Sequence, residues 1–446
     1  MDSRTSGEQG NQIPPLEPEE DSISDAQILW EKVARPLKIP MIISGLYHEK
    51  GTNKDSSESA FKGDSLPFLA MRIYHILVML FLWFNFARFL VSFPMTGSQH
   101  SQDLTYNNIS VSSWAFLVAA NNTVFLKICY KGDIFQLIAN QSKLCFRPIQ
   151  LGDGASNRRQ IQSSWTKYRS FAIGGTFIGL CATCTNIGTI LFMNYGLEES
   201  SIYHRVMCFP WSSDLACGFS AVFAVYGSAT WTLTVVFIAF ICYIMSGQLA
   251  QLTRDFAKTF GERRNFDAKL LDSFRRNFNT LCRSVELADE MLSPFVAIAY
   301  CTNIPGIIFL LYQVWFPDVS TSTSYHLIAS FWIVGTVLNL AIVSYFAVTV
   351  HEKAHSLRRH VHDLQTATFD PEIAQIQMLF LARLDGPEIG MTALGCFVIT
   401  KERVLAVIST LITYFTILLQ FKGLCPDESD GIRNSTFATS TTAYTT

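Results

Sequence analysis

VLAVISTLITYFTILLQF, residues 404–421, is an apolar stretch near the end of the chain that is long enough to cross a bilayer. An α-helix rises about 1.5 Å per residue, and the hydrocarbon core of a membrane is about 30 Å thick. Polar residues recur along it at helical spacing and share one narrow stripe: Ser409, Thr413, Thr416 and Gln420. Hydroxyls can bond back to their own helix, and Gln420 can mark the membrane edge. A polar stripe is also suited to facing a partner helix or water.

The rest of the chain has the composition of a polytopic membrane protein. Of its 446 residues, 49% are hydrophobic and only 16% are charged. Six more apolar stretches precede the one quoted, so the sequence predicts an all-α membrane protein with seven transmembrane helices: 73–93, 111–129, 170–193, 219–245, 295–316, 325–350 and 404–421.

The distribution of Lys and Arg predicts the orientation. With the N-terminus inside, 29 of the 34 Lys and Arg residues lie on the inner side, three on the outer side and two in spans. This asymmetry favours a cytoplasmic N-terminus and an extracellular C-terminus. Apolar residues at helical spacing within 249–293, and a helical pattern in 352–388, predict cytoplasmic helical extensions.

Three regions follow from these patterns. Residues 1–66 are predicted to be a cytoplasmic N-terminal region, largely disordered, with a juxtamembrane amphipathic segment. Pro36 and Pro40 argue against one regular helix in that segment. Residues 67–421 form the seven-helix domain, and 422–446 are an extracellular tail. Nothing near Met1 has the basic-then-apolar pattern of a signal peptide, so we expect no cleavage.

The end of the last span carries a recognisable motif. Thr413, Tyr414, Gln420 and Phe421 resemble the TYhhhhhQF signature of the insect-type gustatory receptor family, and Thr392, Gly395 and Phe397 resemble its preceding small-residue turn. The resemblance implies a plasma-membrane taste receptor that acts as a tetrameric ligand-gated cation channel, homomeric or shared with other gustatory receptors. The polar stripe would then line the pore, and Phe421 would form the gate. The Glu that follows the TY pair in the sugar-sensing branch is replaced by Phe415, which disfavours a sugar ligand.

A small-molecule tastant would enter a pocket between the outer halves of spans three to six. Aromatic and hydrogen-bonding side chains are available there, although each also suits a membrane-interface belt. The candidate ligand-binding residues are Tyr195, Tyr226, Trp231, Tyr312, Gln313 and Trp332.

Two other classes of function were weighed. His351, Glu352 and His355 match HExxH, and Leu384, Asp385 and Gly386 resemble the LDG element of intramembrane zinc proteases. HExxH lies at the cytosolic mouth of span six, where polar and basic residues are ordinary interface anchors, and LDG lies in a charged inner segment. The sequence therefore predicts no enzyme, no catalytic or metal residues and no cofactor. A G-protein-coupled receptor would have the opposite orientation, and its characteristic motifs are absent from the sequence.

Modification sites were expected on the outer side. Asn108 and Asn434 lie in glycosylation sequons, which would make the protein a glycoprotein. Cys208 and Cys217 share an outer loop in an oxidising compartment, so a disulfide between them is as plausible as two thiols. No nucleic-acid partner is expected.

Overall fold

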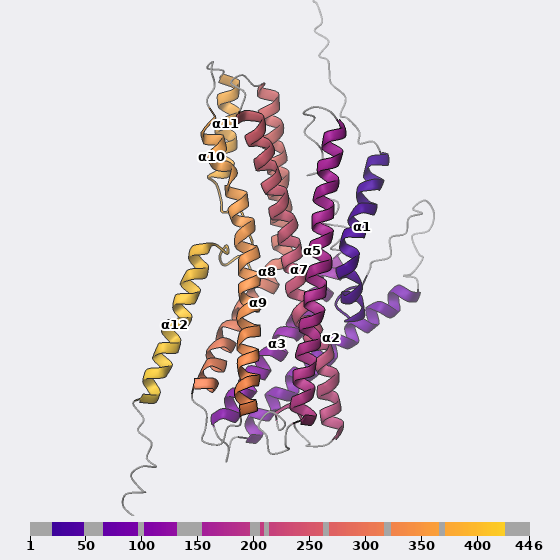
Figure 1. Ribbon diagram of the computed structural model, residues 1–446, viewed down its shortest axis with the longest axis vertical. Helices are drawn as coiled ribbons and strands as arrows, with labels where there is room; N and C mark the ends of the chain where they lie inside the picture. The colour runs from indigo at the N-terminus through magenta and orange to yellow at the C-terminus, as the bar shows by residue number, and fades with distance from the viewer. Residues whose placement is uncertain are drawn as a thin grey trace, which may run out of the picture.

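The computed structural model describes residues 20–48, 66–96, 102–131, 154–196, 206–208, 214–261, 267–315, 323–364 and 371–423. These residues form an elongated helical bundle (Figure 1). Its elements are α1 (Glu20–Ile43), α2 (Leu66–Thr96), α3 (Gln102–Lys131), α5 (Gly154–Leu191), the π-helical turn η1 (Phe192–Gly196), α7 (Asp214–Gly261), α8 (Ala268–Trp315), α9 (Thr323–His355), α10 (Leu357–His362), α11 (Pro371–Leu384) and α12 (Lys401–Gly423).

Within the part of the chain that the structure describes, six helices are long and apolar enough to cross a membrane: α2, α3, α5, α7, α8 and α9. They coincide with the first six predicted spans, and the protein is a multi-pass membrane protein. The seventh predicted span coincides with α12, whose crossing of the membrane remains a prediction, as does the orientation. Among the described residues the non-helical pairing is a single bridge between Thr392 and Val398.

The α7 helix lies at the centre of the bundle. In the most apolar 18-residue stretch of α7, 78% of the residues are buried, compared with 17% in that of α2. α5, α8 and α9 pack around α7, and phenylalanines fill much of the shared core. Phe237 of α7 contacts Phe125 of α3 and Phe295 of α8, with ring centroids 5.3 and 6.4 Å away. Such offset ring contacts add to the apolar burial that holds long helices together.

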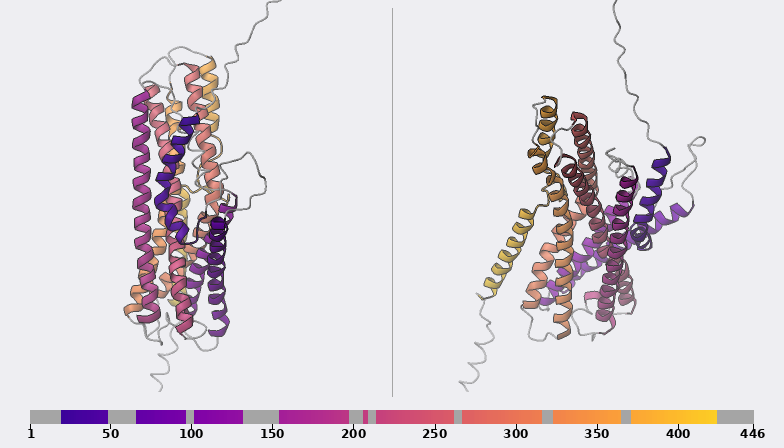
Figure 2. Two further views of the ribbon diagram at one scale, coloured as in Figure 1. Left: turned by 90° about the vertical axis from the view of Figure 1, so that its right-hand side faces the viewer. Right: turned by 45° about the horizontal axis from the view of Figure 1, so that its top comes forward.

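The segment around Pro36 and Pro40 is one continuous helix, α1, so the expectation that these prolines would interrupt it was wrong. Each proline removes one helical hydrogen bond. Burial of one face offsets this loss, because Trp30, Val33 and Leu37 are all buried against the bundle. Trp30 lies 6.1 Å from the ring of Trp165 on α5, and α1 runs beside α5 (Figure 2).

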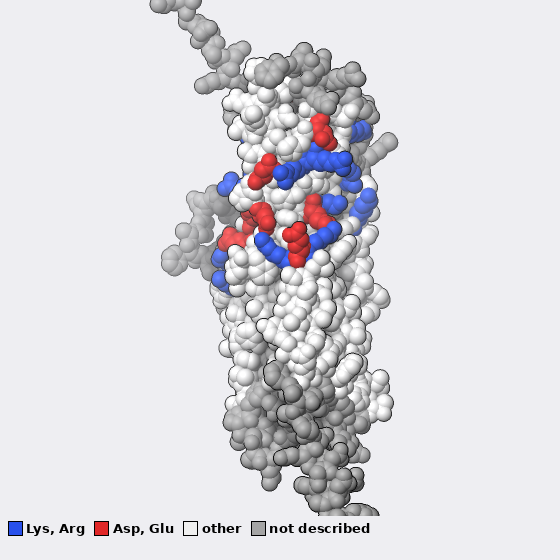
Figure 3. Space-filling model, turned by 90° about the vertical axis from the view of Figure 1, so that its left-hand side faces the viewer, with Lys and Arg blue, Asp and Glu red and all other residues white. Residues whose placement is uncertain are grey.

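The helical extensions predicted between spans four and five are confirmed as helices. α7 continues to Gly261, and α8 begins at Ala268 with Phe274 and Phe278 buried. Phe380 of α11 packs on Phe278, with centroids 5.4 Å apart. On the face with α12, the charged side chains gather in a belt beside these extensions, and the surface below it is almost free of charge (Figure 3).

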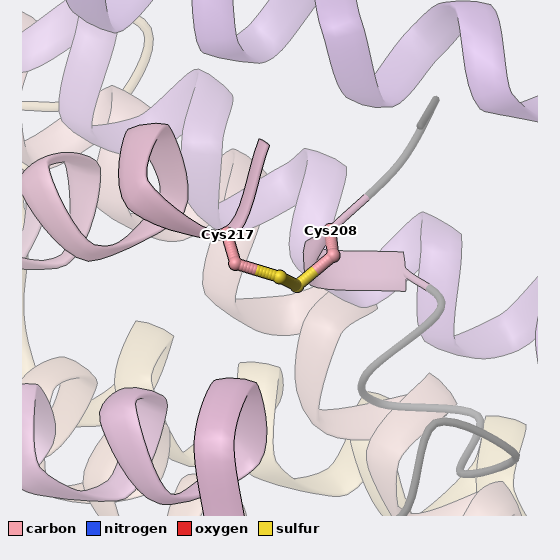
Figure 4. The surroundings of a disulfide bond; sticks show 2 residues. All are labelled: Cys208 and Cys217. Carbon is pink, nitrogen blue, oxygen red and sulfur yellow. A yellow bond between two sulfur atoms is a disulfide. The ribbon is translucent and has the colours of Figure 1, made fainter. Parts of the chain in front are cut away.

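Cys208 and Cys217 are bonded as a disulfide (Figure 4). The bond joins the short segment 206–208 to the beginning of α7. Met207 is fully buried in a second apolar cluster that also contains Phe89 and Phe223. The disulfide therefore links the segment 206–208, which is packed in the bundle through Met207, to the beginning of α7.

Candidate functional site

A cavity of about 50 Å³ lies between α3, α5, α7, α8 and α9. Its wall combines three indole rings with hydroxyl and amide groups: Trp114, Trp231, Trp332, Ser110, Ser113, Asn186, Thr302, Asn303 and Thr336. A water occupies about 30 Å³ and a ligand pocket typically 300–1,000 Å³. The cavity therefore has room for water, and a larger guest requires its wall to move.

Two glycines bring the tryptophan rings close to neighbouring helices. A Cβ at Gly335 of α9 would lie 2.8 Å from the Trp231 ring, and a Cβ at Gly227 would lie 3.2 Å from the Trp114 ring. Ordinary Cβ contacts are longer, so larger residues would push these rings. The indole positions, and with them the shape of the cavity, depend on these two glycines.

Several polar atoms in the cavity wall are available to a guest. The Asn186 amide nitrogen donates to Ser228 Oγ at 2.8 Å, which leaves its oxygen without a partner among the described residues. Ser110 Oγ and Trp231 Nε1 are also buried without a partner within the described chain. Buried polar atoms are normally hydrogen-bonded, so these atoms favour a ligand or water that supplies both donors and acceptors.

Only part of the expected ligand-binding set reaches this cavity. Trp231 and Trp332 line it, whereas Tyr195, Tyr226, Tyr312 and Gln313 are not part of its wall. Tyr195 is 61% exposed on η1, and Tyr226 faces Tyr74 of α2, with hydroxyls 3.3 Å apart. Composition could not tell which way each side chain points, and the place of the ligand pocket stays a prediction.

The predicted polar stripe lies on the face of α12 that points away from the bundle. Val404 and Val407 pack on the core, and Phe415 contacts Trp315 of α8 at 6.0 Å between centroids. Ser409, Thr413, Thr416 and Gln420 are all exposed, roughly opposite that packed face. Thr413 and Thr416 donate to the carbonyl oxygens of Ser409 and Ile412 at 2.9 and 2.8 Å. These bonds satisfy the hydroxyl donors, but their oxygens still accept, so the face remains polar.

A compact junction joins α12 to the rest of the bundle. Asp289 of α8 accepts hydrogen bonds from the Thr392 backbone nitrogen at 2.5 Å and from its hydroxyl at 2.8 Å. Gly395 has a φ of 72°, a conformation that glycine adopts at little cost. The next residues bring the Phe397 ring against Tyr300 of α8, with centroids 6.3 Å apart.

Two of the HExxH residues make structural contacts, whereas His355 Nε2 is buried without a hydrogen-bond partner within the described chain. Glu352 forms an ion pair with Lys401 at the start of α12. His351 Nδ1 lies 3.1 Å from the carbonyl oxygen of Ile389. Asp385 of the LDG element pairs with Arg358 at 2.7 Å. These contacts anchor α9 and the junction.

Three expected sites of modification or gating stay predictions. Asn108 lies within α3 with its side chain 1% exposed, which disfavours a glycan there, and its glycosylation stays a prediction. Asn434 and the side chain of Phe421 lie outside the described residues.

A membrane-embedded bundle that holds a tryptophan-lined cavity among its helices has the form of a small-molecule receptor. The chain belongs to the insect gustatory receptor family, because a family model described as "Trehalose receptor" matches residues 174–426. That match extends from α5 to α12. The family is one of chemoreceptors and not of enzymes, and the chain is accordingly a multi-pass plasma-membrane protein.

Individual relatives agree with this assignment. "Gustatory receptor for sugar taste 64f" of Drosophila melanogaster is 21% identical over 230 residues, which cover 51% of this chain and 46% of that relative. The chain thus matches less than half of that relative's length. The olfactory receptor OR5 of Machilis hrabei, solved with eugenol, has a TM-score of 0.64 at 13% identity, covering 89% of this chain and all of that one. Without eugenol the TM-score is 0.61 at 14% identity.

Proposed function

We propose that this chain is one subunit of a tetrameric, ligand-gated, non-selective cation channel that detects a small-molecule tastant. The observation that carries the proposal is the exposed polar face of α12, which no helix of the described chain covers. Four copies arranged around one axis would turn these four faces toward a shared aqueous path. In this proposal residues 1–66 are cytoplasmic, 67–421 form the channel domain and 422–446 are extracellular.

Contacts lead from the cavity to α12. Asn303 lines the cavity and donates to Asn339 of α9 at 3.2 Å. About one turn away on α8, the Tyr300 hydroxyl lies 2.6 Å from Ser344 Oγ of α9, and its ring contacts Phe397. Phe397 lies just before α12. A guest that separates α8 from α9 would therefore displace Tyr300 and, through Phe397, the beginning of the pore helix.

A hydroxylated, sugar-like tastant best matches the chemistry of the cavity wall, which would have to move to admit it. Indole faces together with unpaired Ser and Asn oxygens suit a ligand with apolar ring faces and many hydroxyl groups. The printed names of the family model and of the Drosophila relative both concern sugars. The replacement at Phe415 argued against a sugar, but this ring packs on Trp315 and not in the cavity wall. Phe415 is thus better placed to affect gating than ligand choice.

Whole-cell currents against a panel of sugars and bitter compounds test the proposal. We expect an inward cation current in response to a sugar, and Trp231→Ala should raise the half-maximal concentration without changing the reversal potential. Tyr195→Ala, at an exposed position outside the cavity, is the matched control and should respond like the unmodified protein. A surface-expressed chain that passes no current with any tastant would contradict the channel assignment.

A further inference from the structure

Three metal-ligating side chains from different parts of the chain meet at one buried point. His48 follows α1, His75 lies in α2 and Cys129 lies near the end of α3. Their exposed fractions are 6%, 0% and 3%, and their ligand atoms all lie within 4.8 Å of one another. Sequence analysis did not single them out, because their positions along the chain have no metal-site spacing.

The two imidazole rings face each other through the same ring atom. His48 Nδ1 lies 3.1 Å from His75 Nδ1. One neutral ring could donate to the other, which is the simplest account of the pair alone. The same separation is close to the roughly 3.3 Å expected between two nitrogens on a tetrahedral zinc ion with Zn–N bonds of about 2.0–2.1 Å. A hydrogen bond between the rings involves two of the three clustered donors, whereas a metal ion would use all three.

A neighbouring amide lies close to one of the rings. The Asn122 side-chain nitrogen donates to the Gly45 carbonyl oxygen at 3.1 Å. Its side-chain oxygen and His75 Nε2 are both buried without a hydrogen-bond partner within the described chain. Zinc-binding histidines usually donate their second N–H to such an oxygen, which leaves the first nitrogen free to bind metal. A proton on His75 Nε2 would give Nδ1 the lone pair that a metal requires.

The charge around the cluster must also be accounted for. Arg72 lies over the Tyr130 ring, 4.0 Å from its centroid, and its positive charge opposes a cation at His48. A metal-bound Cys129 would be a thiolate, so it would cancel one of the two charges of a divalent ion. Two imidazoles and one thiolate are donors that zinc accepts, leaving one position for water.

We propose that His48, His75 and Cys129 bind one Zn²⁺ ion. The ion would join the segment after α1 to both α2 and α3. This inference goes beyond the proposed channel function and does not depend on it, because the site shares no residue with the cavity or with α12.

The test is a zinc titration of the full-length protein, purified in detergent and first stripped with a chelator. We expect one zinc per chain by elemental analysis. His75→Gln and Cys129→Ser should each weaken binding by at least about tenfold, since even residues that only support ligands change metal affinity by about 10–100-fold. Cys282→Ser changes a buried thiol outside this cluster and is the matched control, which should bind zinc normally.

Spectroscopy of the unmodified protein keeps the test independent of variants that fail to fold. Cobalt substituted for zinc should give a thiolate-to-metal charge-transfer band, and zinc X-ray absorption should show two nitrogen ligands and one sulfur ligand. Folded protein that binds no zinc, binds it without sulfur, or keeps its zinc in His75→Gln would overturn the proposal. A preference for Cu⁺ over Zn²⁺ would overturn the zinc assignment.

Discussion

The size of the side chain at position 335 controls where the Trp231 indole lies in the cavity wall. A Cβ there would lie 2.8 Å from the ring, so Gly335→Ala must push the indole toward the cavity. Overpacking costs about 1–3 kcal/mol, and about 1.4 kcal/mol corresponds to tenfold in affinity. We therefore expect the half-maximal tastant concentration to rise about tenfold, measured from current dose–response curves.

Gly188→Ala is the matched control for Gly335→Ala. It lies on α5, and a Cβ there would meet no atom within 4 Å. Both variants raise helix propensity equally, so a difference between them reports on the Trp231 contact. Equal tastant sensitivity in the two variants would show that the Trp231 position does not matter for ligand binding.

At the scale of elements, the contact between Tyr300 of α8 and Phe397 connects the cavity-lining helices to α12. Tyr300→Leu removes the ring, and Tyr300→Phe keeps the ring while removing the hydroxyl that faces Ser344. If the ring contact transmits gating, Tyr300→Leu should reduce the maximal tastant-evoked current at unchanged surface amount. Tyr300→Phe should retain most of that current.

A double-mutant cycle separates transmission from simple damage. Combining Tyr300→Leu with Phe397→Leu should cost less than the sum of the single changes, with about 0.5–2 kcal/mol of coupling in the gating free energy. Strictly additive effects on the gating free energy would mean that the contact between the two rings does not transmit gating. Surface biotinylation of each variant checks that the channels reach the membrane.

At the scale of the whole molecule, the uneven distribution of charge predicts how the chain sits in the membrane. The charged belt lies toward the end that carries α10 and α11 (Figure 3), and the sequence places these segments inside. An epitope tag after Thr446 should be labelled on intact cells, whereas a tag before Met1 should be labelled only after permeabilisation. Labelling of the N-terminal tag alone on intact cells would reverse the orientation and exclude the proposed pore arrangement.

The sequence predicts features that depend on local patterns, but not those that depend on contacts between helices distant in sequence. Apolar runs locate helices such as α7 because membrane burial leaves a continuous signal. α1 was misjudged because tertiary burial of Trp30 outweighs the local effect of Pro36. The cavity was only partly predicted, and the meeting of His48 with Cys129 not at all, because both depend on how helices distant in sequence rotate and pack.

The exposed stripe on α12 gives the sharpest test of the assembled channel. In a fourfold assembly one substitution on the stripe appears four times around the axis, so Gln420→Glu would place four carboxylates near permeating cations. We expect a shifted reversal potential or stronger block by divalent cations. Ile417→Val, an apolar exchange off the stripe, should leave both unchanged. Phe421→Ala should raise the ligand-free current if that ring closes the pore. If Gln420→Glu reaches the surface in normal amounts and conducts with unaltered selectivity, the stripe does not line the pore and another face of the assembly must do so.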